Sequence, residues 1–118
     1  MNLADFKKAL ADTDEVQLTV IVAASGRETT RPVWFVPEGD TLTLLPVKGS
    51  GSSWFKNVVK TPSIRLAAND VTITAVARPI TDARRVRDVV EKFRAKYGAD
   101  DVKKYYSKFD VAVEVPLS

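Results

Sequence analysis

Hydrophobic and polar residues alternate along several short stretches of the chain. The clearest stretch is residues 15–24, where Val16, Leu18 and Val20 are separated by Gln17 and Thr19. A two-residue period is typical of a half-buried β-strand. Similar patterns predict six strands in total: 15–24, 31–37, 41–47, 63–69, 71–80 and 111–116.

Apolar residues recur at helical spacing in four other stretches. Near the N-terminus Leu3, Phe6 and Leu10 share one face, and Asn2 can cap the helix. The other predicted helices are residues 54–60, 82–97 and 99–108. The second begins after Ser52 or Ser53 and stops at Pro62, because proline cannot continue a helix.

Two tight turns favour antiparallel pairing of neighbouring strands. Residues 38–40, Glu-Gly-Asp, join one pair of strands, and Asn69-Asp70 join another. Six short strands close most economically as a barrel, which removes exposed edges. We therefore expect an α+β fold: a six-stranded antiparallel β-barrel with short flanking helices, in one domain spanning residues 1–118.

Composition narrows the chemistry, because the sequence contains neither cysteine nor histidine. Disulfides, thiolate or imidazole catalysis, zinc sites rich in His and Cys, and haem held by a proximal His are therefore excluded. Asp100-Asp101 begins a predicted helix, where carboxylates are stabilising, and we read no metal site there. Without cysteine or a membrane-length apolar run, a cytoplasmic protein with no membrane partner is expected.

The segment 45–69 is a candidate anion site. It holds four basic residues and no acidic one, and its loop leads into a helix N-terminus. Backbone N–H groups, the helix dipole, two glycines and a lysine together favour phosphate. The residues expected around the anion are Lys48, Gly49, Ser50, Ser52 and Ser53. The alternative is a flexible hairpin exit whose serines only cap the helix.

For the other candidate residues, a structural role explains the sequence at least as well as a role in ligand binding. Arg27 and Arg31 can add a second cationic contact, or belong to a surface loop and a strand start. Core or rim packing is the favoured role of Trp34 and Trp54. Tyr105 and Tyr106 can include a proton donor, although helical core packing is favoured. No catalytic residue is assigned.

The order of the segments SGR…RPVWFV, GDTLTLL, KGSGSSWFKNVVKTPSIRL and ARPITD resembles the pyridoxamine-phosphate-oxidase-like split β-barrels. Within them it is most similar to the deazaflavin-dependent nitroreductase-type branch. The resemblance covers residues 16–98. Its most telling part is Trp54 and Asn57, followed by Thr61-Pro62. The Arg-rich loop usual in these proteins is shortened to SGRETT, so only Arg27 and Arg31 carry over.

This resemblance implies an oxidoreductase with a split barrel. It implies FMN or an 8-hydroxy-5-deazaflavin coenzyme, with the phosphate beside residues 48–53 and the ring across the second and third strands. The cofactor-binding residues would be Arg31, Trp54 and Asn57 together with the anion loop. Hydride would pass to or from a small organic acceptor. Oligomeric state stays open, with a homodimer favoured.

Two alternatives belong to other functional classes. A barrel that lost its cofactor would serve as a dimeric binding module, because fold does not fix function. A small basic barrel can also bind single-stranded nucleic acid through exposed aromatic residues. Nucleic acid is disfavoured here because Phe35, Phe55 and Phe93 fall inside apolar patterns, and most of the basic charge lies on residues 82–97.

Overall fold

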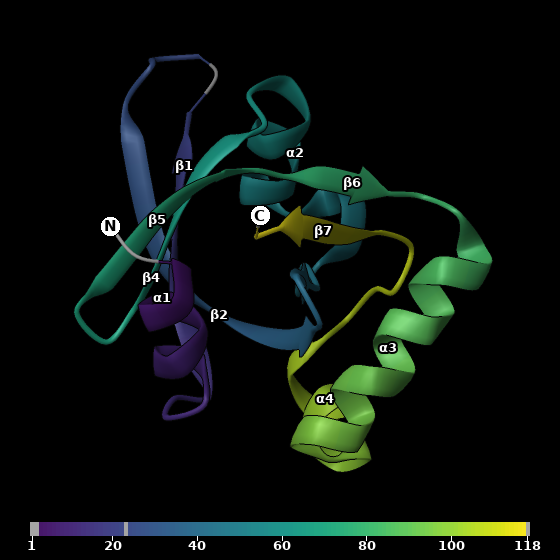
Figure 1. Ribbon diagram of the computed structural model, residues 1–118. Coiled ribbons are helices and arrows are strands. Elements are labelled where there is room, and N and C mark those ends of the chain that lie inside the picture. The colour runs from purple at the N-terminus through teal and green to yellow at the C-terminus, as the bar shows by residue number, and fades with distance from the viewer. Residues whose placement is uncertain (1–2, 23, 118) are drawn as a thin grey trace.

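The computed structural model describes residues 3–22 and 24–117, so the predicted cap Asn2 lies outside the described residues. These ranges contain four α-helices, one 3₁₀ helix (η1) and seven strands (Figure 1). In chain order the elements are α1 Leu3–Leu10, β1 Glu15–Ile21, β2 Glu28–Glu38, β3 Thr41–Leu44, η1 Gly49–Gly51, α2 Ser53–Lys60, β4 Ser63–Ala68, β5 Val71–Val76, β6 Arg78–Ile80, α3 Ala83–Tyr97, α4 Ala99–Tyr105 and β7 Ala112–Pro116.

The strands form one antiparallel sheet in the order β5-β4-β1-β2-β3-β7-β6. β5 and β6 lie at opposite ends of this order, although only Ala77 separates them in the chain. The sheet must therefore curl until its two ends meet, as Figure 1 shows. The expected six strands become seven in the described residues, because the predicted strand 71–80 breaks at Ala77 and its two parts pair with different neighbours.

The predicted hairpin turns are present, and the special backbone angles fall where the sequence allows them. Asn69 takes a φ of 53° between β4 and β5, and Gly39 takes 58° between β2 and β3. Gly98, with a φ of 95°, ends α3. Left-handed angles of this kind cost little at glycine and are tolerated at asparagine. The loop 48–53, a flexible hairpin exit in the alternative interpretation, contains η1 and the first residue of α2.

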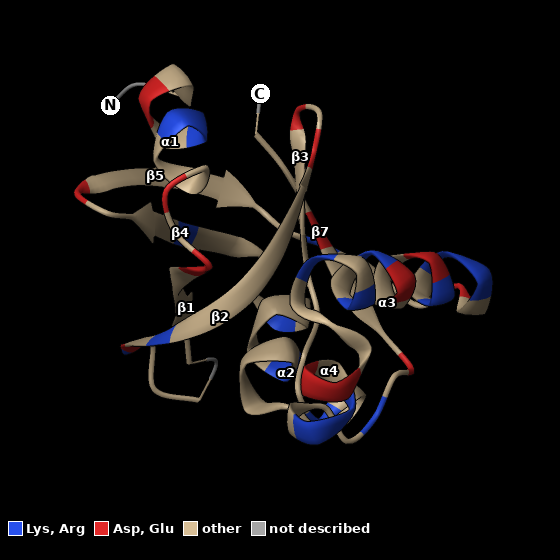
Figure 2. Ribbon diagram, turned by 90° about the horizontal axis from the view of Figure 1, so that it is seen from below, with Lys and Arg blue, Asp and Glu red and all other residues tan. Residues whose placement is uncertain are grey.

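β2 changes partner half-way along its length. Its residues 28–34 pair with β1, and its residues 35–38 pair with β3. Figure 2 shows this strand as one long curved ribbon. The edge of residues 28–34 that faces away from β1 has no strand partner among the described residues, so the barrel is split at this point.

Alternate residues of the split region enter two different hydrophobic clusters. Phe35 and Leu44 pack inside the barrel with α1 and α2. Val36 and Leu45 face outward and pack beneath α3 and α4, around the fully buried Phe93. Both faces of the β2–β3 pair are therefore covered.

Tyr97, the last residue of α3, makes hydrogen bonds to the backbone at the point where β2 changes partner. Its hydroxyl accepts the Phe35 N–H at 3.1 Å and lies 2.7 Å from the Asp14 carbonyl oxygen and 2.9 Å from that of Phe35. Lys96 Nζ also donates to the Phe35 carbonyl, at 2.7 Å. Burial raises the pKa of Tyr97 to about 12, so its hydroxyl remains protonated at neutral pH.

The substitution Tyr97→Phe is expected to destabilise the protein by about 1–3 kcal/mol, because it leaves the part-buried Phe35 N–H without its acceptor. Chemical denaturation measures the change. Tyr105→Phe is the matched control, since the Tyr105 hydroxyl makes no hydrogen bond to another described residue. A loss below about 0.5 kcal/mol, the range of ordinary surface substitutions, would contradict this role of Tyr97.

Candidate functional site

A cavity of about 690 Å³ lies along the unpaired edge of β2. It is bounded by β2 on one side, by the segment between β3 and α2 on another, and by the end of α4. The lining residues are Glu15, Arg31, Pro32, Val33, Trp34, Leu45, Val47, Lys48, Gly51, Ser52, Ser53, Trp54, Tyr105 and Tyr106. The volume is in the usual range for sites of small molecules and cofactors.

Two cations line this cavity without a protein partner. Neither the guanidinium of Arg31 nor the ammonium group of Lys48 makes a hydrogen bond or ion pair with another described residue, and both residues are exposed. Glu15 is the one acidic residue in the lining. Arg65, also basic and in the same segment of sequence, is instead held by Glu28 through two bonds of 2.8 Å. Arg31 and Lys48 are therefore the cations available to an anionic ligand here.

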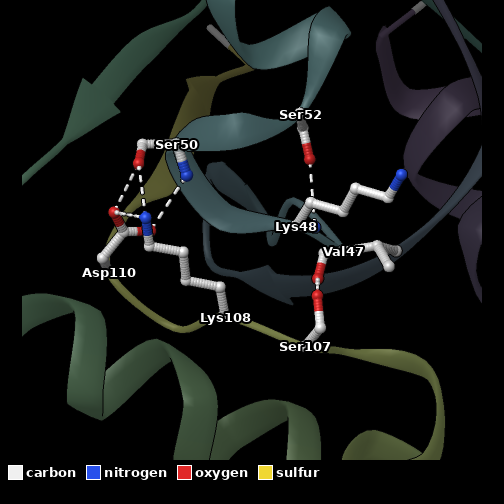
Figure 3. A network of polar contacts seen from close by, with 7 residues as sticks. All are labelled: Val47, Lys48, Ser50, Ser52, Ser107, Lys108 and Asp110. Carbon is white, nitrogen blue, oxygen red and sulfur yellow. Dashed lines mark hydrogen bonds and ion pairs between the residues drawn. The ribbon is translucent and has the colours of Figure 1, made fainter.

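The N-terminus of α2 opens on the same cavity. Ser52 is the N-cap residue, but its hydroxyl makes no capping hydrogen bond. It instead accepts the Lys48 N–H at 3.1 Å and is buried (Figure 3). The first N–H groups of a helix have no acceptor within it, so those of the α2 first turn are available to a ligand. Ser53, exposed at the first helical position, lines the cavity beside them.

Three residues of the predicted cofactor site do not line the cavity. Gly49 and Ser50 lie on the opposite side of the loop, against Asp110 of the segment before β7 (Figure 3). Asn57 is one turn into α2 and half-buried. The structure brings together the other five: Arg31, Lys48, Ser52, Ser53 and Trp54.

Aromatic side chains of β2 and α4 form one wall of the cavity. Trp34 stacks on Tyr97 with ring centroids 4.1 Å apart and an interplanar angle of 8°. Tyr105 meets Trp34 edge-on at 5.7 Å and is 52% exposed, whereas Tyr106 is buried in the outer cluster. Burial also raises the pKa of Tyr106, so this tyrosine remains neutral. Trp54 is 3% exposed and packs in the inner core.

Sequence reasoning missed several lining residues. Glu15 and Val47 had no distinguishing pattern, since they are the first residue of a strand and a residue just after one. Tyr105 was favoured as core, but α4 ends at this residue, which turns its ring outward. The sequence offered one unused signal: two adjacent tyrosines at a helix end cannot both face the core.

Residues 3–22 and 24–117 contain no group of three or more acidic side chains placed to hold a metal ion. Within the same ranges, no helix is both long and apolar enough to cross a membrane.

The family of the chain is shown by a sequence match over most of its length. A family model described as an uncharacterised protein conserved in bacteria, DUF2255, matches residues 7–113. The chain belongs to this family. A search of curated proteins finds no match to the sequence of this DUF2255 member.

Similar solved structures identify the fold of this DUF2255 protein. An F420-H2-dependent reductase, FDR-A, is 20% identical, with a TM-score of 0.67 over 86% of this chain and 93% of its own. HutZ, the heme storage protein of Vibrio cholerae, is 16% identical, with a TM-score of 0.73 over 98% and 90%. A candidate pyridoxamine 5′-phosphate oxidase from Listeria innocua is 14% identical, with a TM-score of 0.70 over 96% and 90%. The fold is the pyridoxamine-phosphate-oxidase-like split barrel, as the order of motifs predicted.

The two tryptophans should differ in their access to solvent. In Trp54→Phe, the emission of Trp34 at the open cavity is expected to be quenched strongly by acrylamide. In Trp34→Phe, the emission of the core residue Trp54 is expected to be quenched at least about threefold less, because its ring is shielded by packing. Equal quenching constants in the two variants would contradict the description of the cavity.

Proposed function

We propose that this cavity binds a phosphate-bearing flavin-type cofactor, either FMN or an 8-hydroxy-5-deazaflavin coenzyme. The protein would then be an oxidoreductase that moves hydride to or from a small organic acceptor. The observation that carries the proposal is one cavity with two unpartnered cations and an open helix N-terminus, and with an aromatic wall.

The loop side of the cavity fits a phosphate group. Lys48 supplies a charge-assisted hydrogen bond, and the first-turn N–H groups of α2 supply neutral ones along the positive end of the helix dipole. The Ser53 hydroxyl can add a donor at the same end. Arg31, on β2, is the second cation in the lining. These donors are therefore typical of an anion site, and none of their side chains is bound to a carboxylate of another described residue.

The aromatic wall fits a planar ring system. Trp34 is fixed from behind by its stack on Tyr97, so its orientation does not depend on the ligand. Tyr105 is exposed and free to pack against a ring that enters from solvent. Val33 and Leu45 add apolar surface to the lining. A flat, largely apolar ring with a charged tail matches this division of the cavity.

The cofactor itself supplies hydride chemistry, so the protein needs no acid–base triad. This agrees with a chain that has neither histidine nor cysteine. The residues of the site would bind the phosphate, orient the ring and exclude water from the reacting face. Proteins of this fold that are described as an F420-H2-dependent reductase and a candidate pyridoxamine 5′-phosphate oxidase support the same class of cofactor.

A second candidate is a dimeric binding module that uses the barrel without this cofactor. It is favoured by two similar structures, one described as a domain-swapped dimer and one as a heme storage protein. Haem held by a proximal histidine is excluded for this chain, which has no histidine. Dimerisation is compatible with either candidate function.

Lys48→Ala is expected to weaken binding of FMN or of the deazaflavin by about ten- to a hundredfold, because a hydrogen bond to a charged group contributes about 1.5–3 kcal/mol. Fluorescence titration of the purified protein with each cofactor measures the change. Lys56→Ala is the matched control: this lysine is exposed on α2, also lacks a described partner, and does not line the cavity.

Equal losses in Lys48→Ala and Lys56→Ala would mean that general surface charge, and not the cavity, attracts the phosphate. If the folded wild-type protein binds neither cofactor, the oxidoreductase proposal fails and the cofactor-free module becomes the better account.

A further inference from the structure

The loop between β3 and α2 has two sides with different partners. Lys48 and Ser53 face the cavity. On the other side, the Asp110 carboxylate accepts the Ser50 N–H at 2.9 Å and the Ser50 hydroxyl at 2.5 Å (Figure 3). Figure 3 also shows the Lys48 side chain extending away from this cluster. The Ser50 donors, which face away from the cavity, are thus already bound by the Asp110 carboxylate.

Gly49 shows how closely Asp110 approaches the loop. Its φ is 56°, and a Cβ built on this residue would overlap Asp110 Oδ1. It would also meet Lys108 Cγ and Cβ at 3.1 and 3.2 Å. Any side chain at this position would therefore push Asp110 away from Ser50.

The chain that carries Asp110 is also tied to the loop at a second point. The Ser107 N–H donates to the Val47 carbonyl at 2.9 Å. Residues 107–110 directly follow Tyr105 and Tyr106, which line the cavity. Contacts at Val47 and at Ser50 thus bind the loop on both sides of Lys48 to the segment that carries the tyrosines.

We propose that Asp110 is a positioning residue: by holding Ser50 from behind, it fixes the loop so that Lys48 and the α2 N-terminus face the cavity at a set distance from the aromatic wall. The effect on ligand binding rests on the function proposed above. The effect on loop order does not, so the two can be tested separately.

The ligand-free test is amide hydrogen exchange. In Asp110→Asn, the amides of residues 49–52 are expected to exchange at least about tenfold faster than in wild type, while those of β1 and β4 keep their rates. Asp101→Asn, an exposed acid on α4, is the charge-matched control. If Asp110→Asn does not fold, Ser50→Ala removes the 2.5 Å bond to Asp110, together with the 3.4 Å bond that Lys108 Nζ donates to the same hydroxyl, and carries the same expectation. Unchanged exchange in the loop would overturn the proposal.

A pH titration tests the contact directly. Hydrogen bonds from Ser50 hold the pKa of Asp110 below its ordinary value, and the neighbouring Lys108 adds to this effect. Arg87 and Arg94 of α3 line a shallow pocket with the same carboxylate. Because the folded pKa is lowered, the contact is complete at neutral pH and is lost as pH falls through that lowered pKa.

The Ser50 amide proton shift should therefore titrate with a midpoint below the ordinary aspartate pKa of about 3.9. In Ser50→Ala the midpoint of the Asp110 carboxyl should move up toward that value. A midpoint that stays the same in Ser50→Ala would overturn the proposed contact.

Cofactor binding distinguishes positioning from simple charge. Neutralising an acidic residue near a cationic loop should strengthen binding of an anion if only charge matters. Positioning predicts the opposite: Asp110→Asn should weaken FMN binding by about tenfold, with Asp101→Asn unchanged. Tighter or equal binding in Asp110→Asn, where wild type binds FMN, would overturn the role in binding. Failure of wild type to bind FMN would instead reject the proposed function and leave the exchange test to decide.

Gly49→Ala and Gly39→Ala form a matched pair. The two glycines have φ values of 56° and 58°, so alanine meets the same backbone strain at each. Only at Gly49 does the new Cβ overlap Asp110, since nothing lies within 4 Å of a Cβ at Gly39. Fast exchange of residues 50–52 is expected in Gly49→Ala alone. Protection retained in both variants would contradict the close approach of Asp110.

Discussion

The partner change of β2 is the constraint on which the rest of the structure depends. A strand that pairs with β1 over residues 28–34 and with β3 over residues 35–38 leaves backbone groups without a ladder at the junction. Buried backbone groups need partners, and Tyr97 and Lys96 of α3 supply them at Phe35. The helix that packs on the outside of the sheet is thus also what completes the sheet at its split.

The same junction creates the cavity and shapes its wall. The last residue of β3, Leu44, pairs with Phe35, so the edge of β2 before Phe35 is open. The loop to α2 lies across the cavity from this edge. The Tyr97 hydroxyl bonds at this junction, and the Tyr97 ring stacks on Trp34. The next helix, α4, ends at Tyr105, which meets Trp34 edge-on. The same few aromatic residues therefore both stabilise the fold at this junction and line or support the cavity.

Much of the fold could be predicted from local patterns. Alternating apolar residues defined β1, turn residues defined the β2–β3 and β4–β5 hairpins, and helical spacing defined α3. The break at Ala77 could not be predicted, because β5 and β6 form one continuous strand-like sequence and separate only through tertiary pairing. For the site, Lys48 and Ser53 followed from loop chemistry, and Arg31 from the resemblance. Ser50 was expected in the site for the same reasons as Ser53, but it is hydrogen-bonded to Asp110, sixty residues away, which local sequence could not reveal.

The central claim is that one end of this cavity holds a phosphate and the other a planar ring. The most direct measurement is a crystal structure of the protein with FMN or with the deazaflavin coenzyme bound. We expect the phosphate within hydrogen-bonding distance of Lys48 Nζ and of the first-turn N–H groups of α2, with the ring beside Trp34 and Tyr105. A phosphate bound elsewhere, with the Lys48 side chain still in solvent, would contradict the account.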